Sequence, residues 1–302
     1  MKYRCHPGFS TKLELLKYGI QSIYFLVGLF FHYSLLKVLT KKWTVYSKFH
    51  FLKLYYLDSI LSVVIIVMDL TIIRIMNYIP PLCPWALREF TESSQFISLL
   101  FIEQYLKIVK CLIFCFSMVN RANCVICPMS FGTIQRCVIP HFIVFCFLSP
   151  FIGVWTVFLS ESQLVPFQGG FIHESRMNFR WITVSQFTVL IYCITIVVVC
   201  ICSLISMICM SRIRSENKHT EQSMTASALF MSILYVFALS IEIYSSQAHH
   251  SSLEMFEFWR AISSFSFDIL VVCPPVVMLC LNVRLRVDTF ARHIDNVSTS
   301  PK

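Results

Sequence analysis

Seven long apolar stretches separated by short loops constrain this chain more than any other feature of its sequence. A bilayer core about 30 Å thick requires roughly 20 apolar residues of helix, and each stretch reaches that length. Because the hydrocarbon core offers no water to backbone groups, such segments have to be helices. We expect an all-α membrane protein with seven transmembrane helices, over residues 16–39, 54–73, 96–119, 138–158, 181–210, 224–245 and 261–281.

The composition agrees with a membrane protein. Of the 302 residues, 57% are hydrophobic and 14% are charged, whereas soluble globular domains carry roughly 25% charged residues. We expect three parts: an N-terminal segment over 1–15, a helical domain over 16–281 and a tail over 282–302. With no soluble domain to bind nucleic acid, the formal net charge of +9 should serve anchoring at the membrane surface.

The distribution of basic residues between the loops predicts the orientation. Lys and Arg number 14 in the first, third and fifth loops and the tail, against 9 on the opposite side. Because positive residues are retained on the cytoplasmic side, we expect an extracellular N-terminus and a cytoplasmic tail. This count assigns Arg74, which follows the second span, to the outer side.

The chain has 14 cysteines, but their positions argue against a disulfide-rich protein. All except Cys5 and Cys83 lie in spans or in the inferred cytoplasmic loops, where thiols stay reduced. The outer loop between the fourth and fifth spans contains no cysteine. Two possibilities stay open for the outer pair: a disulfide between Cys5 and Cys83, or two free thiols.

Charged residues inside the spans mark the candidate functional positions. An ionised side chain at mid-membrane costs at least about 2.5–3.5 kcal/mol, so it needs a partner or a water-filled cavity. Glu103 precedes Lys107 by four residues, the favourable order for a helical ion pair, and Lys110 follows one turn later. We expect all the ionisable side chains to face the bundle interior; they are Asp58, Asp69, Glu103, Lys107, Lys110, Glu242 and Asp268.

Depth in the membrane divides these residues into two groups. Asp69 and Glu242 lie in the outer parts of their spans and Glu103 lies nearer the middle, so we expect an extracellular ligand to contact these three. The others are better placed for an internal network that holds the resting state; they are Asp58, Lys107, Lys110 and Asp268. Structural ion pairs without a switching role explain the same pattern equally well.

Other classes of function fit the sequence less well. The chain has no H-E-x-x-H or comparable catalytic motif, and Cys124 and Cys127 form a lone C-x-x-C pair without the further ligands of a zinc site. We therefore expect no catalytic activity, no metal and no cofactor. A seven-span transporter or ligand-gated channel is the main alternative, but spans one to three contain no helix-breaking proline and show no similarity to spans five to seven.

Five local patterns follow one another along the chain. The third span ends in Met-Val-Asn-Arg-Ala-Asn-Cys-Val over 118–125. The others are Leu-Tyr-Tyr-Leu-Asp-Ser over 54–59, Tyr-Ile-Pro-Pro-Leu-Cys-Pro over 78–84, Asp-Ile-Leu-Val-Val-Cys-Pro-Pro over 268–275 and Asn-Val-Arg over 282–284. In their order and placement these patterns resemble the nematode serpentine receptors, most closely the class gamma chemoreceptors.

The resemblance implies a rhodopsin-like, G-protein-coupled chemoreceptor for a small molecule such as an odorant or pheromone. It also implies the plasma membrane or sensory cilia as location and a heterotrimeric G protein as partner. By the same resemblance, Arg121 should hold neighbouring helices at rest and meet the G protein when active. Asn120 replaces the usual acidic residue and can accept a hydrogen bond from the guanidinium. Alternatively, Arg121 only anchors the helix at anionic headgroups.

Overall fold

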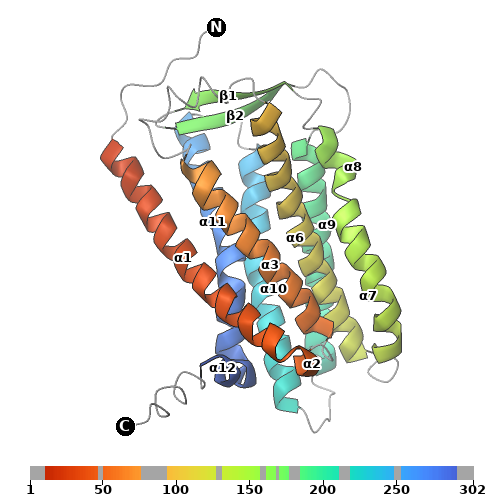
Figure 1. The fold of residues 1–302 in the computed structure, drawn as a ribbon. Coiled ribbons are helices and arrows are strands. Elements are labelled where there is room, and N and C mark those ends of the chain that lie inside the picture. Colours follow the sequence, from red (N-terminus) through yellow and green to blue (C-terminus); the bar gives the residue numbers. More distant parts are fainter. Residues whose placement is uncertain are drawn as a thin grey trace, which may run out of the picture.

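The computed structural model describes residues 11–46, 50–75, 94–126, 131–156, 161–167, 170–176, 184–210, 218–247 and 253–290. Within these ranges seven long helices form one bundle (Figure 1). They are α1 (Thr11–Lys41), α3 (His50–Met68), α6 (Ser94–Ile126), α7 (Phe131–Leu148), α9 (Val184–Met210), α10 (Lys218–Gln247) and α11 (Leu253–Leu281). The predicted class, an all-α membrane bundle of seven helices, is confirmed.

Five of the helices in the described ranges are long and apolar enough to cross a membrane by length and composition alone: α1, α3 with its continuation, α9, α10 and α11. The apolar stretch over Val138–Val154, which begins in α7, is shorter. The remaining long helix, α6, carries three charged residues close together, Glu103, Lys107 and Lys110. The polar residues of α6 therefore need partners inside the bundle.

The two ends of the bundle carry different short elements. At one end lie the start of α1 and a hairpin of β1 (Glu161–Phe167) and β2 (Gly170–Arg176); at the other lie α2 (Trp43–Tyr46) and α12 (Val283–Phe290) (Figure 1). We call these the outer end and the inner end, after the predicted orientation. Along the bundle, α6 packs against α3, α7 and α9, while α1 packs against α3 and α11.

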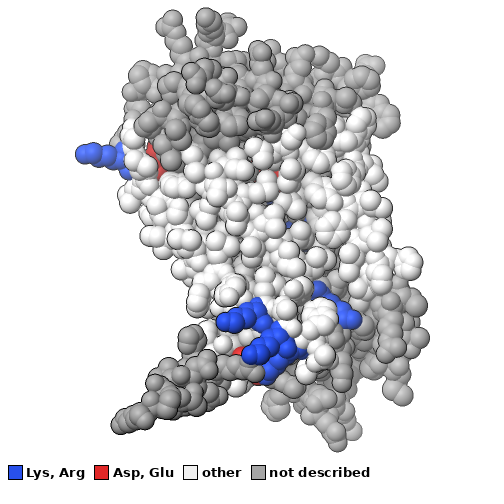
Figure 2. Space-filling view, viewed as in Figure 1, with Lys and Arg blue, Asp and Glu red and all other residues white. Residues whose placement is uncertain are grey.

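The outside of the bundle is apolar around its middle. Large exposed hydrophobic side chains such as Phe30 on α1 and Ile201 on α9 point away from the core. Figure 2 shows a largely uncharged belt across the face in view, with Lys and Arg gathered near the inner end. A belt of this kind matches the hydrocarbon region of a bilayer, and a basic end matches the cytoplasmic surface.

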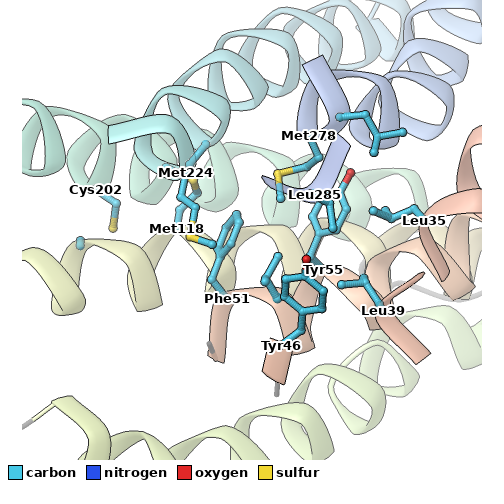
Figure 3. Packing of buried hydrophobic residues seen from close by; sticks show 14 of the residues in the cluster. Leu35, Leu39, Tyr46, Phe51, Tyr55, Met118, Cys202, Met224, Met278 and Leu285 are labelled. Atoms are coloured by element: carbon cyan, nitrogen blue, oxygen red, sulfur yellow. The ribbon is translucent and has the colours of Figure 1, made fainter. Parts of the chain in front are cut away.

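At the inner end, buried apolar residues from most of the helices converge (Figure 3). Members such as Leu39, Tyr55, Met118, Met224 and Met278 come from α1, α3, α6, α10 and α11, respectively. This cluster therefore joins the helix ends that the sequence predicts to face the cytoplasm.

The hairpin β1–β2 and the break in the fourth span were not predicted. The strands pair antiparallel, from Glu161 opposite Arg176 to Phe167 opposite Gly170. The fourth span, expected over 138–158, ends as α7 at Leu148 and resumes beyond Pro150 as α8 (Phe151–Val154).

The helix α12 occupies the first part of the predicted tail and docks on the inner end of α1. The Asn282 side chain begins the helix, because its Oδ1 accepts a hydrogen bond from the Leu285 amide at 3.1 Å. Asp288 pairs with the Lys42 ammonium at 2.5 Å and accepts a hydrogen bond from the Tyr46 hydroxyl. These contacts tie the end of α11 to the turn that follows α1.

Candidate functional site

A buried ionic cluster lies in the outer half of the bundle, around Arg74. Its guanidinium Nη2 is 2.5 Å from Oδ1 of Asp268 on α11 and 3.7 Å from Oδ2 of Asp69. The Tyr24 hydroxyl of α1 also donates to Asp268, and the ring of Phe25 lies 5.5 Å from the guanidinium carbon. Arg74, Asp69 and Asp268 are all buried, so the cluster joins α1, α3 and α11 away from water.

A π-helical turn explains why Arg74 points inward. The end of α3 widens into η1 (Asp69–Ile73), with Arg74 directly after it. In a regular α-helix, residues five apart point about 140° away from each other. A π turn has i to i+5 hydrogen bonding, which brings residues five apart onto one face. Asp69 and Arg74 can therefore contact each other and Asp268 together.

This position corrects the assignment of Arg74 to the outer loop side. Only 6% of the residue is exposed, and its charge is balanced inside the bundle. One signal in the sequence pointed to this position of Arg74. Asp69 and Asp268 are carboxylates inside the membrane that need a cation, and Arg74 is the basic residue nearest to Asp69 along the chain.

Lys107 gathers the three predicted ligand residues around one ammonium group. It pairs with Glu103 one turn earlier on α6, as the spacing predicts, and its ammonium lies 5.0 Å from the ring centre of Phe267. Asp69 and Glu242 also interact electrostatically with Lys107. The outer cluster thus contains four carboxylates, two basic groups and the aromatic rings that border them.

A second ion pair lies deeper in the bundle. The Lys110 ammonium is 2.7 Å from Oδ1 of Asp58 and 2.6 Å from Oγ of Ser62. Lys110 is completely buried, and Asp58 nearly so. A charge in this position is tolerable only because its partner is held within bonding distance.

The predicted four-residue network is therefore divided in two. Asp58 and Lys110 do contact each other, but Lys107 and Asp268 belong to the outer cluster. The reason is that Lys107 pairs with Glu103, and Asp268 pairs with Arg74, instead of pairing with the residues of the deeper ion pair. The predicted network contained Lys107 and Lys110 as its cations but left out Arg74, which pairs with Asp268.

At the inner end, Arg121 lies buried between three helices. Its Nη2 donates to Oγ1 of Thr225 on α10 at 3.2 Å, and its guanidinium lies 5.5 Å from the ring centre of Phe51 on α3. Only 3% of Arg121 is exposed. The side chain thus points into the helix bundle rather than out toward a headgroup layer.

Asn120 is also buried, but it does not accept the hydrogen bond expected from Arg121. Both atoms of its side-chain amide have no hydrogen-bond partner among the described residues. Adjacent residues of an α-helix point about 100° apart, which directs Asn120 away from the guanidinium. The hydrogen bond that Asn120 could accept from the Arg121 guanidinium is therefore not made among the described residues.

The proposed Cys5–Cys83 pair lies outside the described residues. Within the described ranges, no disulfide joins the cysteines whose side chains are placed.

Seven helices around a charged interior, with an apolar belt and a basic inner end, define a polytopic membrane protein of the receptor type. The sequence profile of the family described as "Srg family chemoreceptor" matches residues 18–289, and the chain belongs to this family. The predicted resemblance to class gamma serpentine receptors is thereby confirmed, and the chain is a multi-pass membrane receptor.

Two relatives from Caenorhabditis elegans show how far the similarity extends. The chain is 69% identical to serpentine receptor class gamma-30 over 299 residues, which is 99% of each chain. It is 31% identical to serpentine receptor class gamma-5 over 288 residues, covering 93% of this chain and 88% of that one. The matched regions therefore extend along nearly the whole chain and across all seven helices.

Proposed function

We propose that this receptor detects a small extracellular molecule, an odorant or pheromone, in its outer ionic cluster and passes the signal to a heterotrimeric G protein. The observation that carries the proposal is the collection of Asp69, Glu103 and Glu242 around Lys107 in the outer half of the bundle. Charged groups in a membrane interior are costly, and their usual justification is a ligand, an ion path or a switch.

The proposed site connects to the helices that would have to move. Asp69 begins η1, which continues α3, while Glu103 belongs to α6 and Glu242 to α10. Arg121 at the inner end contacts α3 and α10 from α6. A ligand that changes the spacing of these three helices at the outer end would change the surroundings of Arg121. We propose that Arg121 then leaves Thr225 and Phe51 and becomes accessible to the G protein, with Asn120 beside it.

The location follows from the same proposal. We propose a plasma-membrane receptor, in sensory cilia where these occur, with the N-terminus outside and α12 inside. The basic residues near the inner end support this orientation because anionic lipids lie in the cytoplasmic leaflet (Figure 2).

The test is a calcium or cAMP screen of cells that express the receptor, challenged with nematode secretions and volatile odorants. We expect at least one fraction to give a response that mock-transfected cells lack. For an active fraction, Glu103→Gln should raise the concentration for half-maximal response at unchanged surface level. Glu14→Gln is the control, since Glu14 pairs with Lys17 on α1, outside the cluster. Equal effects of both variants would refute Glu103 as a ligand contact.

A further inference from the structure

The deeper ion pair is surrounded by buried polar atoms that have no protein partner. They are Nδ1 of His32, the hydroxyl oxygens of Tyr55 and Tyr235, and Oγ of Ser59; none has a hydrogen-bond partner among the described residues. The four residues come from α1, α3 and α10, and each is less than a tenth exposed.

These atoms belong to one region of the core. Electrostatic interactions link Lys110 to His32, Asp58 to Tyr55, and Tyr235 to both Asp58 and Tyr55. On α3, Tyr55, Ser59 and Ser62 are spaced by four and three residues, so they lie on one face of the helix. Ser62 already bonds to Lys110. The region is therefore a polar centre, bounded by α1, α3, α6 and α10.

The hydrogen-bonding needs of these atoms define what fills the centre. His32 Nε2 lies 2.8 Å from the Val271 carbonyl oxygen. A carbonyl only accepts, so Nε2 carries the proton and Nδ1 is left as an acceptor that needs a donor. The Tyr55, Ser59 and Tyr235 hydroxyls can each donate and accept. The occupant must therefore supply both donors and acceptors.

Charge limits the occupant to a neutral molecule. The Asp58 carboxylate is balanced by the Lys110 ammonium at 2.7 Å, and the polar atoms around the pair are uncharged. A metal cation would add a charge with no second carboxylate to balance it, in a membrane interior where that is costly. Water is neutral, small, and both donor and acceptor, and buried waters typically make about three bonds to groups of this kind.

We propose that ordered water molecules occupy the polar centre beside Asp58 and Lys110 and bridge the side chains of α1, α3, α6 and α10. Buried polar groups in proteins are nearly always bonded to protein or to ordered water, which accounts for these four atoms at once. The water molecules extend the ion pair into a network that holds four helices together, whatever ligand the receptor detects.

The experiment removes single hydroxyl oxygens and follows the melting temperature of the purified receptor in nanodiscs. Tyr235→Phe and Tyr55→Phe should each lower Tm, by about 2–4 °C for the loss of one typical hydrogen bond. A hydroxyl buried without water would give the opposite result, because its removal relieves an unsatisfied polar group. An unchanged or raised Tm in both variants would overturn the proposal. Tyr244→Phe, at a 51% exposed position on α10, is the control and should leave Tm unchanged.

The double variant tests whether the two tyrosines use the same water. Their combined loss of Tm should be smaller than the sum of the single losses, since the first substitution already weakens the shared water. Strictly additive losses would overturn the shared network.

Radical footprinting gives a reading that needs no variant. Hydroxyl radicals formed from bound water by an X-ray pulse should oxidise Tyr55 and Tyr235, as detected by mass spectrometry. Phe116 is equally buried but lies in an apolar cluster with Leu54 and Ile139, so it should stay unmodified. Unmodified Tyr55 and Tyr235 would overturn the proposal even if the variants failed to fold.

Discussion

Removing the charge of Arg74 should destabilise the receptor far more than removing an exposed lysine. Arg74 is 2.5 Å from Asp268 and 3.7 Å from Asp69, and all three side chains are at most 7% exposed. Arg74→Met leaves both carboxylates in the bundle without their cation. Breaking a buried ion pair by removing one partner typically costs about 3–5 kcal/mol, so we expect a loss in that range.

The two sides of this cluster should respond unequally. Asp268→Asn leaves Arg74 with Asp69 as a second carboxylate, so we expect it to cost less than Arg74→Met. The double variant Arg74→Met/Asp268→Asn should recover part of the free energy of unfolding that Arg74→Met loses. It removes the cation together with one of the two carboxylates that Arg74→Met leaves behind.

The measurement is the free energy of unfolding in mixed micelles of increasing SDS content, followed by tryptophan fluorescence. Lys17→Met is the matched control: Lys17 pairs with Glu14 at 2.7 Å, but its side chain is 48% exposed. Glu14 is itself buried, but Lys17 is half exposed and screened by water, so this variant should cost less than Arg74→Met. If Arg74→Met cost no more than Lys17→Met, the buried cluster and the role of the π turn would be refuted.

Three further predictions concern packing and topology. Gly153→Ala should lower Tm, because the new Cβ would lie 2.2 Å from a ring of α9, whereas Gly19→Ala on α1 meets nothing within 4 Å and should not lower it. An N-terminal epitope should be stained on intact cells and a C-terminal epitope only after permeabilisation; the reverse would refute the orientation. If Cys5 and Cys83 form a disulfide, impermeant thiol reagents should label intact cells weakly until reductant is added, and strong labelling beforehand would show free thiols.

Sequence patterns predicted those parts of the fold that depend on local composition. Long apolar runs have few alternatives in a bilayer, so helices were expected over each of the seven apolar stretches. The contact between Glu103 and Lys107 depends only on spacing within one helix, and it was predicted correctly.

Contacts between distant segments were harder to predict. The pairing of Arg74 with Asp268 depends on the π turn of Asp69–Ile73, and the sequence of that turn gives no sign of the wider geometry. For Asp58 and Lys110, the cost of burial predicted that each needs a partner but not which one. At Asn120, by contrast, the hydrogen bond to its neighbour that the residue types allow is not made among the described residues.

The most direct test of the receptor account is agonist-evoked G-protein activation by Arg121→Ala, compared with the wild type at equal surface level. Arg121 lies at the inner end, far along α6 from Glu103, so ligand binding should be largely unchanged. Activation should be abolished or strongly reduced, and Arg121→Lys should retain part of it, because the charge remains while the planar five-donor group is lost. Normal surface level, binding and activation in Arg121→Ala would contradict the assigned role of Arg121 and the signalling route proposed through it.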